Sequence, residues 1–73
     1  MSQQNLHFTV NAEPRQAAVG TTIADVVTTT LGDAPTQGVA VAVDGEVIAK
    51  SAWPSTPITD SAAVEIVTAF VGG

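Results

Sequence analysis

The segment from residue 39 to residue 48 constrains the fold more than any other part of this 73-residue chain. Residues 39–43 alternate valine with alanine, which is the two-residue period of a β-strand. Asp44-Gly45 follows directly and favours the two-residue turn of a β-hairpin, which would lead into Val47 and Ile48. Valine on one face and alanine on the other predict a central strand that another element covers on one face.

Weaker alternation predicts three further strands. Residues 6–10 alternate apolar with polar side chains, and residues 15–19 repeat the pattern less clearly after a turn opened by Asn11, so the two segments predict an N-terminal hairpin. Residues 64–66 have the same period and predict a last strand that ends near Ala69. The loop over 50–61, rich in Ser, Thr and Pro, is expected to be pinned to the core by Trp53 and Ile58.

The segment 22–31 gives conflicting signals. Its β-branched run has poor helix propensity and favours a strand. A strand, however, would place Asp25 on the buried face. Thr22 is a suitable N-cap, with Asp25 as a partial match to a capping box, and Gly32 is a suitable helix end. The apolar residues also recur at helical spacing, and they favour a helix: Ile23, Val26, Val27 and Leu31.

The order strand, strand, helix, strand, strand, loop, strand predicts an α+β fold of the β-grasp (ubiquitin-like) type. We expect a mixed sheet of four to five strands with one helix packed on one face. A chain this short forms one domain at most, which we place at residues 1–69, with 1–5 as a polar N-terminal extension. Residues 70–73 are predicted to be a flexible C-terminal tail.

Composition excludes several classes of function. The formal net charge is −5 and only two residues are basic, so nucleic acid is a poor partner and a basic protein surface a better one. The absence of cysteine removes disulfides, thiolate ligands and a cysteine nucleophile. No apolar stretch approaches the ~20 residues needed to span a bilayer, and the first residues lack the features of a signal peptide. We therefore expect no membrane partner and a cytoplasmic protein.

The side chains offer no catalytic or metal-binding constellation. His7 is expected to face solvent from its strand, and Trp53 to fill the core. Serine and threonine are plentiful, but no positioned base accompanies them. The carboxylates lack metal-ligand spacing and are expected to be solvated: Asp25, Asp33, Asp44, Glu46, Asp60 and Glu65. We predict that the chain is not an enzyme and that it binds neither a metal ion nor a cofactor of its own.

The remaining candidate is the C-terminus, Phe70-Val71-Gly72-Gly73. A terminal Gly-Gly is weak evidence alone, because many chains end in small residues, but it gains weight after the last strand of a β-grasp fold. The Gly73 carboxylate resists nucleophiles until it is activated. Its attack on ATP would give an acyl adenylate, from which a sulfur donor could then produce a thiocarboxylate. Gly72 lacks a Cβ and could thread through a narrow channel, and four extended residues reach about 13 Å.

These residues resemble the ThiS family, the sulfur carrier proteins of thiazole (thiamine) biosynthesis, from Phe8 to the C-terminus. The resemblance rests on the segments Phe8–Asn11, Gly20–Asp25, Gly38–Val47, Ser51–Trp53, Thr56-Pro57, Val64–Ala69 and Gly72-Gly73. It implies a β-grasp carrier whose final glycine, here Gly73, is adenylated by a ThiF-type adenylyltransferase and converted to a covalent thiocarboxylate. It also implies a cysteine desulfurase or rhodanese-type sulfur donor, and thiazole synthase as the acceptor.

Three departures from the family pattern bear on structure. Ala12 stands where the family's Asn-Gly turn has glycine, which questions the geometry of the first turn because alanine resists positive φ. Asp60-Ser61-Ala62 replaces a common Asp-Gly-Asp turn. The tail is also more apolar than usual, so we expect Val67, Phe70 and Val71 to form an exposed partner-binding patch. The alternative is that Phe70 folds back onto the sheet.

Three alternative functions stay open. The small subunit of molybdopterin synthase shares the fold and the chemistry, but its tail carries a proline pair where this chain has Thr68-Ala69. A ubiquitin-like modifier would be conjugated to a target lysine through Gly73. A plain β-grasp binding module would have an inert C-terminus.

Overall fold

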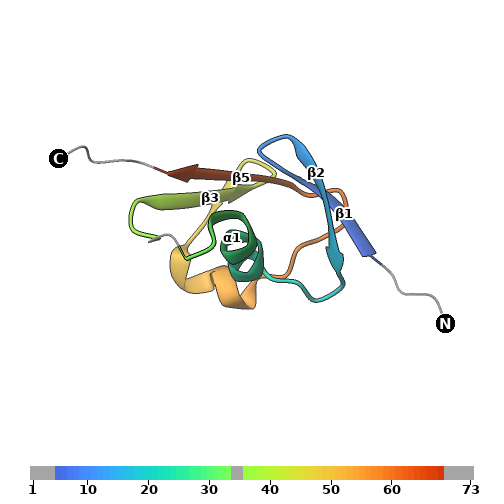
Figure 1. Ribbon diagram of the computed structural model, residues 1–73, viewed down its shortest axis with the longest axis horizontal. Coiled ribbons are helices and arrows are strands. Elements are labelled where there is room, and N and C mark those ends of the chain that lie inside the picture. The colour runs from blue at the N-terminus through green and yellow to red at the C-terminus, as the bar shows by residue number, and fades with distance from the viewer. Residues whose placement is uncertain (1–4, 34–35, 69–73) are drawn as a thin grey trace.

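The structure is a computed structural model that describes residues 5–33 and 36–68. It forms a five-stranded mixed sheet with strand order β2-β1-β5-β3-β4, and α1 lies against one face of it (Figure 1). The predicted β-grasp fold is confirmed. The elements are β1 Asn5–Val10, β2 Glu13–Ala18, α1 Ile23–Leu31, β3 Val39–Val43, β4 Glu46–Ile48, the 3-10 helix η1 Lys50–Ser55 and β5 Ala63–Thr68.

The last strand, β5, lies in the middle of the sheet. It runs parallel to β1 on one side and antiparallel to β3 on the other. The β1–β2 and β3–β4 hairpins flank β5, so β3 is an interior strand, as its alternation of valine and alanine predicts. In Figure 1, β1 starts at one end of the molecule and β5 ends at the other. The position of β5 fixes where the chain leaves the domain toward its C-terminus.

Spacing prevails over local propensity in α1. The Thr22 hydroxyl accepts a hydrogen bond from Asp25 N at 3.2 Å, and Thr22 N donates to the Asp25 carboxylate at 3.0 Å. These two bonds complete a capping box, which the sequence suggested only in part. The helix ends at Gly32, whose N–H donates to Thr28 O at 2.8 Å. Burial of one apolar face stabilises the helix despite its β-branched residues.

The core lies between α1, the sheet and η1. Trp53 and Ile58 are buried in it, as predicted, and the Trp53 indole N–H donates to Ile48 O at 3.1 Å. The segment before Ile58 is not a simple loop, because Lys50–Ser55 forms η1. Among the described residues, the buried apolar side chains are those of Phe8, Val10, Ile23, Val26, Val27, Val41, Trp53, Ile58, Ala62, Val64 and Ile66.

Two boundaries differ from the prediction. β1 begins at Asn5, which we assigned to the polar extension, and β2 spans Glu13–Ala18 rather than 15–19. The turn between them determines the second difference. Asn11 and Ala12 form a two-residue connection that pairs Val10 with Glu13, so β2 starts immediately after Ala12. The predicted ends of the domain at Ala69 and of the tail at residues 70–73 lie outside the described residues.

Candidate functional site: the C-terminal end of strand β5

The described structure defines the point from which the C-terminal segment leaves the domain. β5 pairs with β3 from Val64, opposite Val43, to Thr68, opposite Val39. Of the predicted site residues, only Val67 lies in this described part. The others lie outside the described residues: Phe70, Val71, Gly72 and Gly73.

Val67 is part of an exposed apolar strip on the face of the sheet opposite α1. Its side chain is 60% exposed, and it pairs across the ladder with Ala40, which is also exposed. On β4, Val47 is 74% exposed and pairs with Ala42. Because side chains alternate between the two faces of a strand, Val67, Ala40, Ala42 and Val47 share one face. We name these four residues the outer apolar strip.

Sequence analysis missed the contribution of Val47 to this strip. The residue was predicted only as part of a hairpin strand. The two-residue turn at Asp44-Gly45 carried the signal, because it pairs Val47 with Ala42 and so places Val47 on the face opposite the buried Val41. The pairing of β3 with β5 was needed to place Val67 on that same face. Glu65 lies in the same face, two residues before Val67.

Several of the carboxylates that were expected to be solvated are exposed and also accept hydrogen bonds from the backbone. Asp44 Oδ1 accepts a hydrogen bond from Ala63 N at 2.9 Å, and Asp60 Oδ1 accepts one from His7 N at 2.9 Å. With Asp25 in the capping box, three of the acidic residues therefore hold turns or helix ends. Within residues 5–33 and 36–68, no group of three His, Asp or Glu side chains could hold a metal ion.

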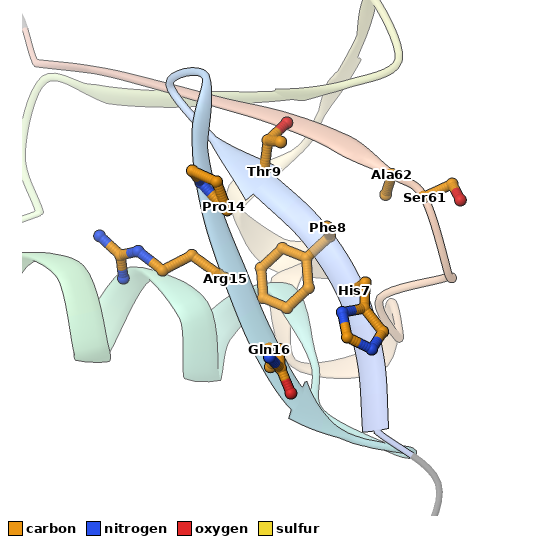
Figure 2. A pocket seen from close by; sticks show the side chains of 8 residues that line it. All are labelled: His7, Phe8, Thr9, Pro14, Arg15, Gln16, Ser61 and Ala62. Carbon is orange, nitrogen blue, oxygen red and sulfur yellow. The ribbon is translucent and has the colours of Figure 1, made fainter.

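A groove in the described part of the chain lies away from the end of β5. It has a volume of about 540 Å³ and is lined by β1, β2 and the residues before β5 (Figure 2). His7 is exposed at this groove, as predicted, and the Arg15 side chain extends away from the imidazole. Arg15 instead lies 3.5 Å from the Glu13 carboxylate. Because the two groups diverge, they do not form a shared anion site.

Asn11, at the first turn, contacts β5 directly. Its side-chain carbonyl accepts a hydrogen bond from Ile66 N at 2.9 Å, and its side-chain amide donates to Ile66 O at 3.2 Å. The Asn11 N–H donates to Val64 O at 2.8 Å. The sequence predicted only a turn at Asn11, since asparagine is common in turns. The two side-chain bonds join residues 55 positions apart, and no local sequence pattern predicts such contacts.

Alanine at position 12 does not prevent a positive φ in the first turn. Asn11 has φ 52° and Ala12 has φ 72°, so both central residues adopt the left-handed region that a type I′ hairpin turn needs. Ser61 likewise has φ 68° in the turn before β5. Both replacements for glycine therefore keep a positive φ, at an energetic cost in each case.

Over residues 5–33 and 36–68, the five-stranded mixed sheet with α1 against one face defines a small ubiquitin-like β-grasp domain. The family model for the ThiS family matches residues 8–73. The chain therefore belongs to the ThiS family, whose members are small sulfur carrier proteins rather than enzymes.

The solved structures similar to the chain include two of thiamine biosynthesis proteins. One is the crystal structure of the thiamine biosynthesis protein ThiS from Geobacter metallireducens, with 28% identity, a TM-score of 0.69, and coverage of 93% of this chain and 100% of that one. The other is the NMR solution structure of a thiamine biosynthesis protein from Geobacter metallireducens, with 27% identity, a TM-score of 0.69, and coverage of 93% and 88%. No curated protein matches the chain at a significant level.

None of the helices in the described part of the chain is long and apolar enough to cross a membrane.

Proposed function

We propose that this protein carries sulfur as a thiocarboxylate on Gly73 and donates it for thiazole formation in thiamine biosynthesis. The observation that carries the proposal is the family match, which extends through residue 73 and so includes the terminal Gly-Gly. The fold supports it, because the central strand β5 leads toward that terminus from a rigid sheet. A carrier of this kind supplies a reactive end on a compact scaffold.

The proposed chemistry has two steps. A Gly73 carboxylate oxygen attacks the α-phosphorus of ATP, the bond to the β-phosphate breaks, and pyrophosphate leaves with formation of the acyl adenylate. A sulfide nucleophile then attacks the acyl carbon, AMP leaves, and the thiocarboxylate remains. The α-carboxylate needs this activation because, with an ordinary pKa of about 3.3 to 3.7, it is ionised at neutral pH.

The chain's own side chains take no part in this chemistry under the proposal. Arg15 is paired with Glu13, and the Lys50 ammonium lies 3.4 Å from Thr36 O and 5.9 Å from the centre of the Trp53 ring. ATP, its metal ion and the cations that stabilise the transferring phosphate would therefore be bound by a ThiF-type adenylyltransferase. A cysteine desulfurase or rhodanese-type protein would supply the sulfur, thiazole synthase would receive it, and the carrier would hold no cofactor other than its covalent thiocarboxylate. We place these reactions in the cytoplasm.

We assign docking of the adenylyltransferase to the outer apolar strip together with Phe70 and Val71. Val67 and Val47 expose enough apolar surface to contribute on burial, at about 25 cal/mol per Å². The net charge of −5 favours a partner with basic groups around its apolar contact. Gly72 would pass through the narrow channel to the adenylation site, because it has no Cβ.

The test is the intact mass of the protein after incubation with ATP, the adenylyltransferase and sulfide. We expect the mass increase of one oxygen replaced by one sulfur, and fragmentation should locate it on Gly73. Two variants serve as controls: deletion of Gly73 shortens the tail by one residue, and Gly72→Ala keeps its length but adds a Cβ. Both should lose thiocarboxylate formation while the domain unfolds at the wild-type temperature.

An unchanged mass of the wild-type protein, under conditions in which the adenylyltransferase modifies a known carrier, would refute the proposal. A stable isopeptide between Gly73 and lysines of other proteins would favour the modifier function instead. If deletion of Gly73 left thiamine synthesis intact in cells, the inert-end alternative would stand.

A further inference from the structure

Strand β5 is bonded on its β1 side for a shorter distance than on its β3 side. The β1 pairing covers Thr9 with Ala63 and Val10 with Val64, whereas the β3 pairing continues to Thr68. The backbone of β1 leaves the sheet at Asn11, where φ becomes positive and the hairpin turn begins. Beyond Val64, the β1-facing edge of β5 therefore needs a different partner.

The side chain of Asn11 supplies that partner by continuing the parallel ladder. Thr9 N donates to Ala62 O at 3.0 Å and Asn11 N to Val64 O at 2.8 Å, which is the regular spacing of two residues. In a regular ladder, the main-chain carbonyl of residue 11 would accept from Ile66 N, and the next N–H of that strand would donate to Ile66 O. The Asn11 amide replaces both groups, with bonds of 2.9 Å and 3.2 Å.

We propose that Asn11 is a positioning residue for tail presentation: its side-chain amide fixes β5 at Ile66 and so sets the place and direction in which the chain leaves the domain toward Gly73. This role rests on the proposed function. Ile66 lies opposite Val41 of β3, and its own N–H and C=O are both bonded by Asn11. The next residue is Val67, the first of the partner-binding residues, so the clamp lies immediately before the docking surface.

Asparagine meets two requirements at this position. It tolerates positive φ better than most residues, so the backbone can turn away from the sheet. Its planar amide also carries one acceptor and two donors, which match the N–H and C=O of Ile66. Aspartate would keep the acceptor but would place a second oxygen against Ile66 O. Glycine would keep the turn but would remove the clamp.

The expected effect follows from ordering the root of the tail. Fixing the backbone of one residue changes an equilibrium constant by roughly fivefold to thirtyfold. Without the clamp, the adenylyltransferase must order the end of β5 itself when the tail enters its active site. We therefore expect Asn11→Gly to raise KM for the carrier by about fivefold or more while kcat stays near the wild-type value. Hydrogen exchange at the Ile66 amide should accelerate by about fivefold to thirtyfold.

The experiment measures adenylate-dependent pyrophosphate release at several carrier concentrations for wild type, Asn11→Gly, Asn11→Asp and Thr22→Ala. Thr22→Ala is the matched control, because it removes the helix cap and lowers stability without touching β5. It should leave KM and Ile66 exchange at wild-type values below the unfolding transition. Asn11→Asp should give a KM between those of wild type and Asn11→Gly, and it serves if the glycine variant does not fold.

The outcomes separate the two proposals. If the wild type is adenylated and the Asn11 variants keep the wild-type KM, the positioning role is wrong and the carrier function stands. If KM rises equally in Thr22→Ala, the effect is one of stability and the positioning role is also wrong. If the wild type is not adenylated at all, the carrier function fails, and the role of Asn11 in it fails too.

Discussion

Replacing Ala12 with glycine should stabilise the protein, although the change removes a methyl group. Ala12 occupies the second central position of the β1–β2 turn with φ 72°. In this left-handed region the Cβ of an L-residue approaches the following carbonyl oxygen. The side chain is exposed, so its removal forfeits little buried surface. The backbone conformation therefore decides the sign of the effect.

The size of the effect is a difference of two terms. Left-handed backbone costs a non-glycine residue about 1–2 kcal/mol. Replacing alanine with glycine relieves this cost but also raises the conformational entropy of the unfolded chain, which lowers stability by about 0.4–1 kcal/mol. The net expectation is a free energy of unfolding higher by roughly 0.5–1 kcal/mol. For a domain of this size, that corresponds to a melting temperature higher by about 2–8 °C.

Thermal and urea unfolding of Ala12→Gly and of the wild type test this expectation. Unfolding is monitored by far-UV circular dichroism and by the fluorescence of Trp53, which is buried in the core. The matched control is Ala40→Gly. It makes the same chemical change at an exposed site inside strand β3, and should destabilise by about 0.5–1 kcal/mol. Opposite signs for the two variants would support the reasoning. Equal or lower stability of Ala12→Gly than of wild type would refute it.

Three further predictions concern single side chains. Val67→Asp should weaken binding to the adenylyltransferase by at least about tenfold, equal to about 1.4 kcal/mol, with little change in stability because Val67 is exposed. Titration calorimetry measures this affinity, with Thr28→Asp as a control outside the proposed surface, and an unchanged affinity would exclude Val67 from the interface. Trp53→Phe should lower the free energy of unfolding by about 1–3 kcal/mol, because Ile48 O loses its indole donor, and a urea midpoint equal to that of wild type would contradict this. Thr30→Val should raise the free energy of unfolding by up to about 1 kcal/mol, since the buried Thr30 hydroxyl has no hydrogen-bond partner among the described residues. Thr28→Val, at an exposed site on the same helix, is the control, and an equal effect of the two substitutions would argue against desolvation of the Thr30 hydroxyl as the cause.

The outcome for α1 illustrates how competing local signals are resolved. The run from Val26 to Thr30 favours a strand by propensity, but the spacing of Ile23, Val26 and Val27 places all three in the core. Burial of these side chains is worth several times the propensity differences, which are a few tenths of a kcal/mol per residue. Spacing was therefore the better guide. The capping box at Thr22 and Asp25 was also recognisable in part, because its two residues lie three positions apart.

The ladder register could not be predicted in the same way. Which strand pairs with β5, and where, depends on contacts between residues far apart in the chain. The shared face of Val47 and Val67 in the outer apolar strip and the clamp between Asn11 and Ile66 both follow from that register. The groove lined by β1 and β2 was also absent from the prediction, for the same reason.

By itself the sequence determined the β-grasp fold, the family and the terminal Gly-Gly, because alternation, helical spacing, turn residues and motif order are local properties of the chain. Only the tertiary structure decided which face of the sheet stays open, that Ala12 keeps a left-handed turn, and that an asparagine side chain takes the place of a strand beside β5. These features need strands brought together from distant parts of the chain, and their energies arise only after that pairing has formed.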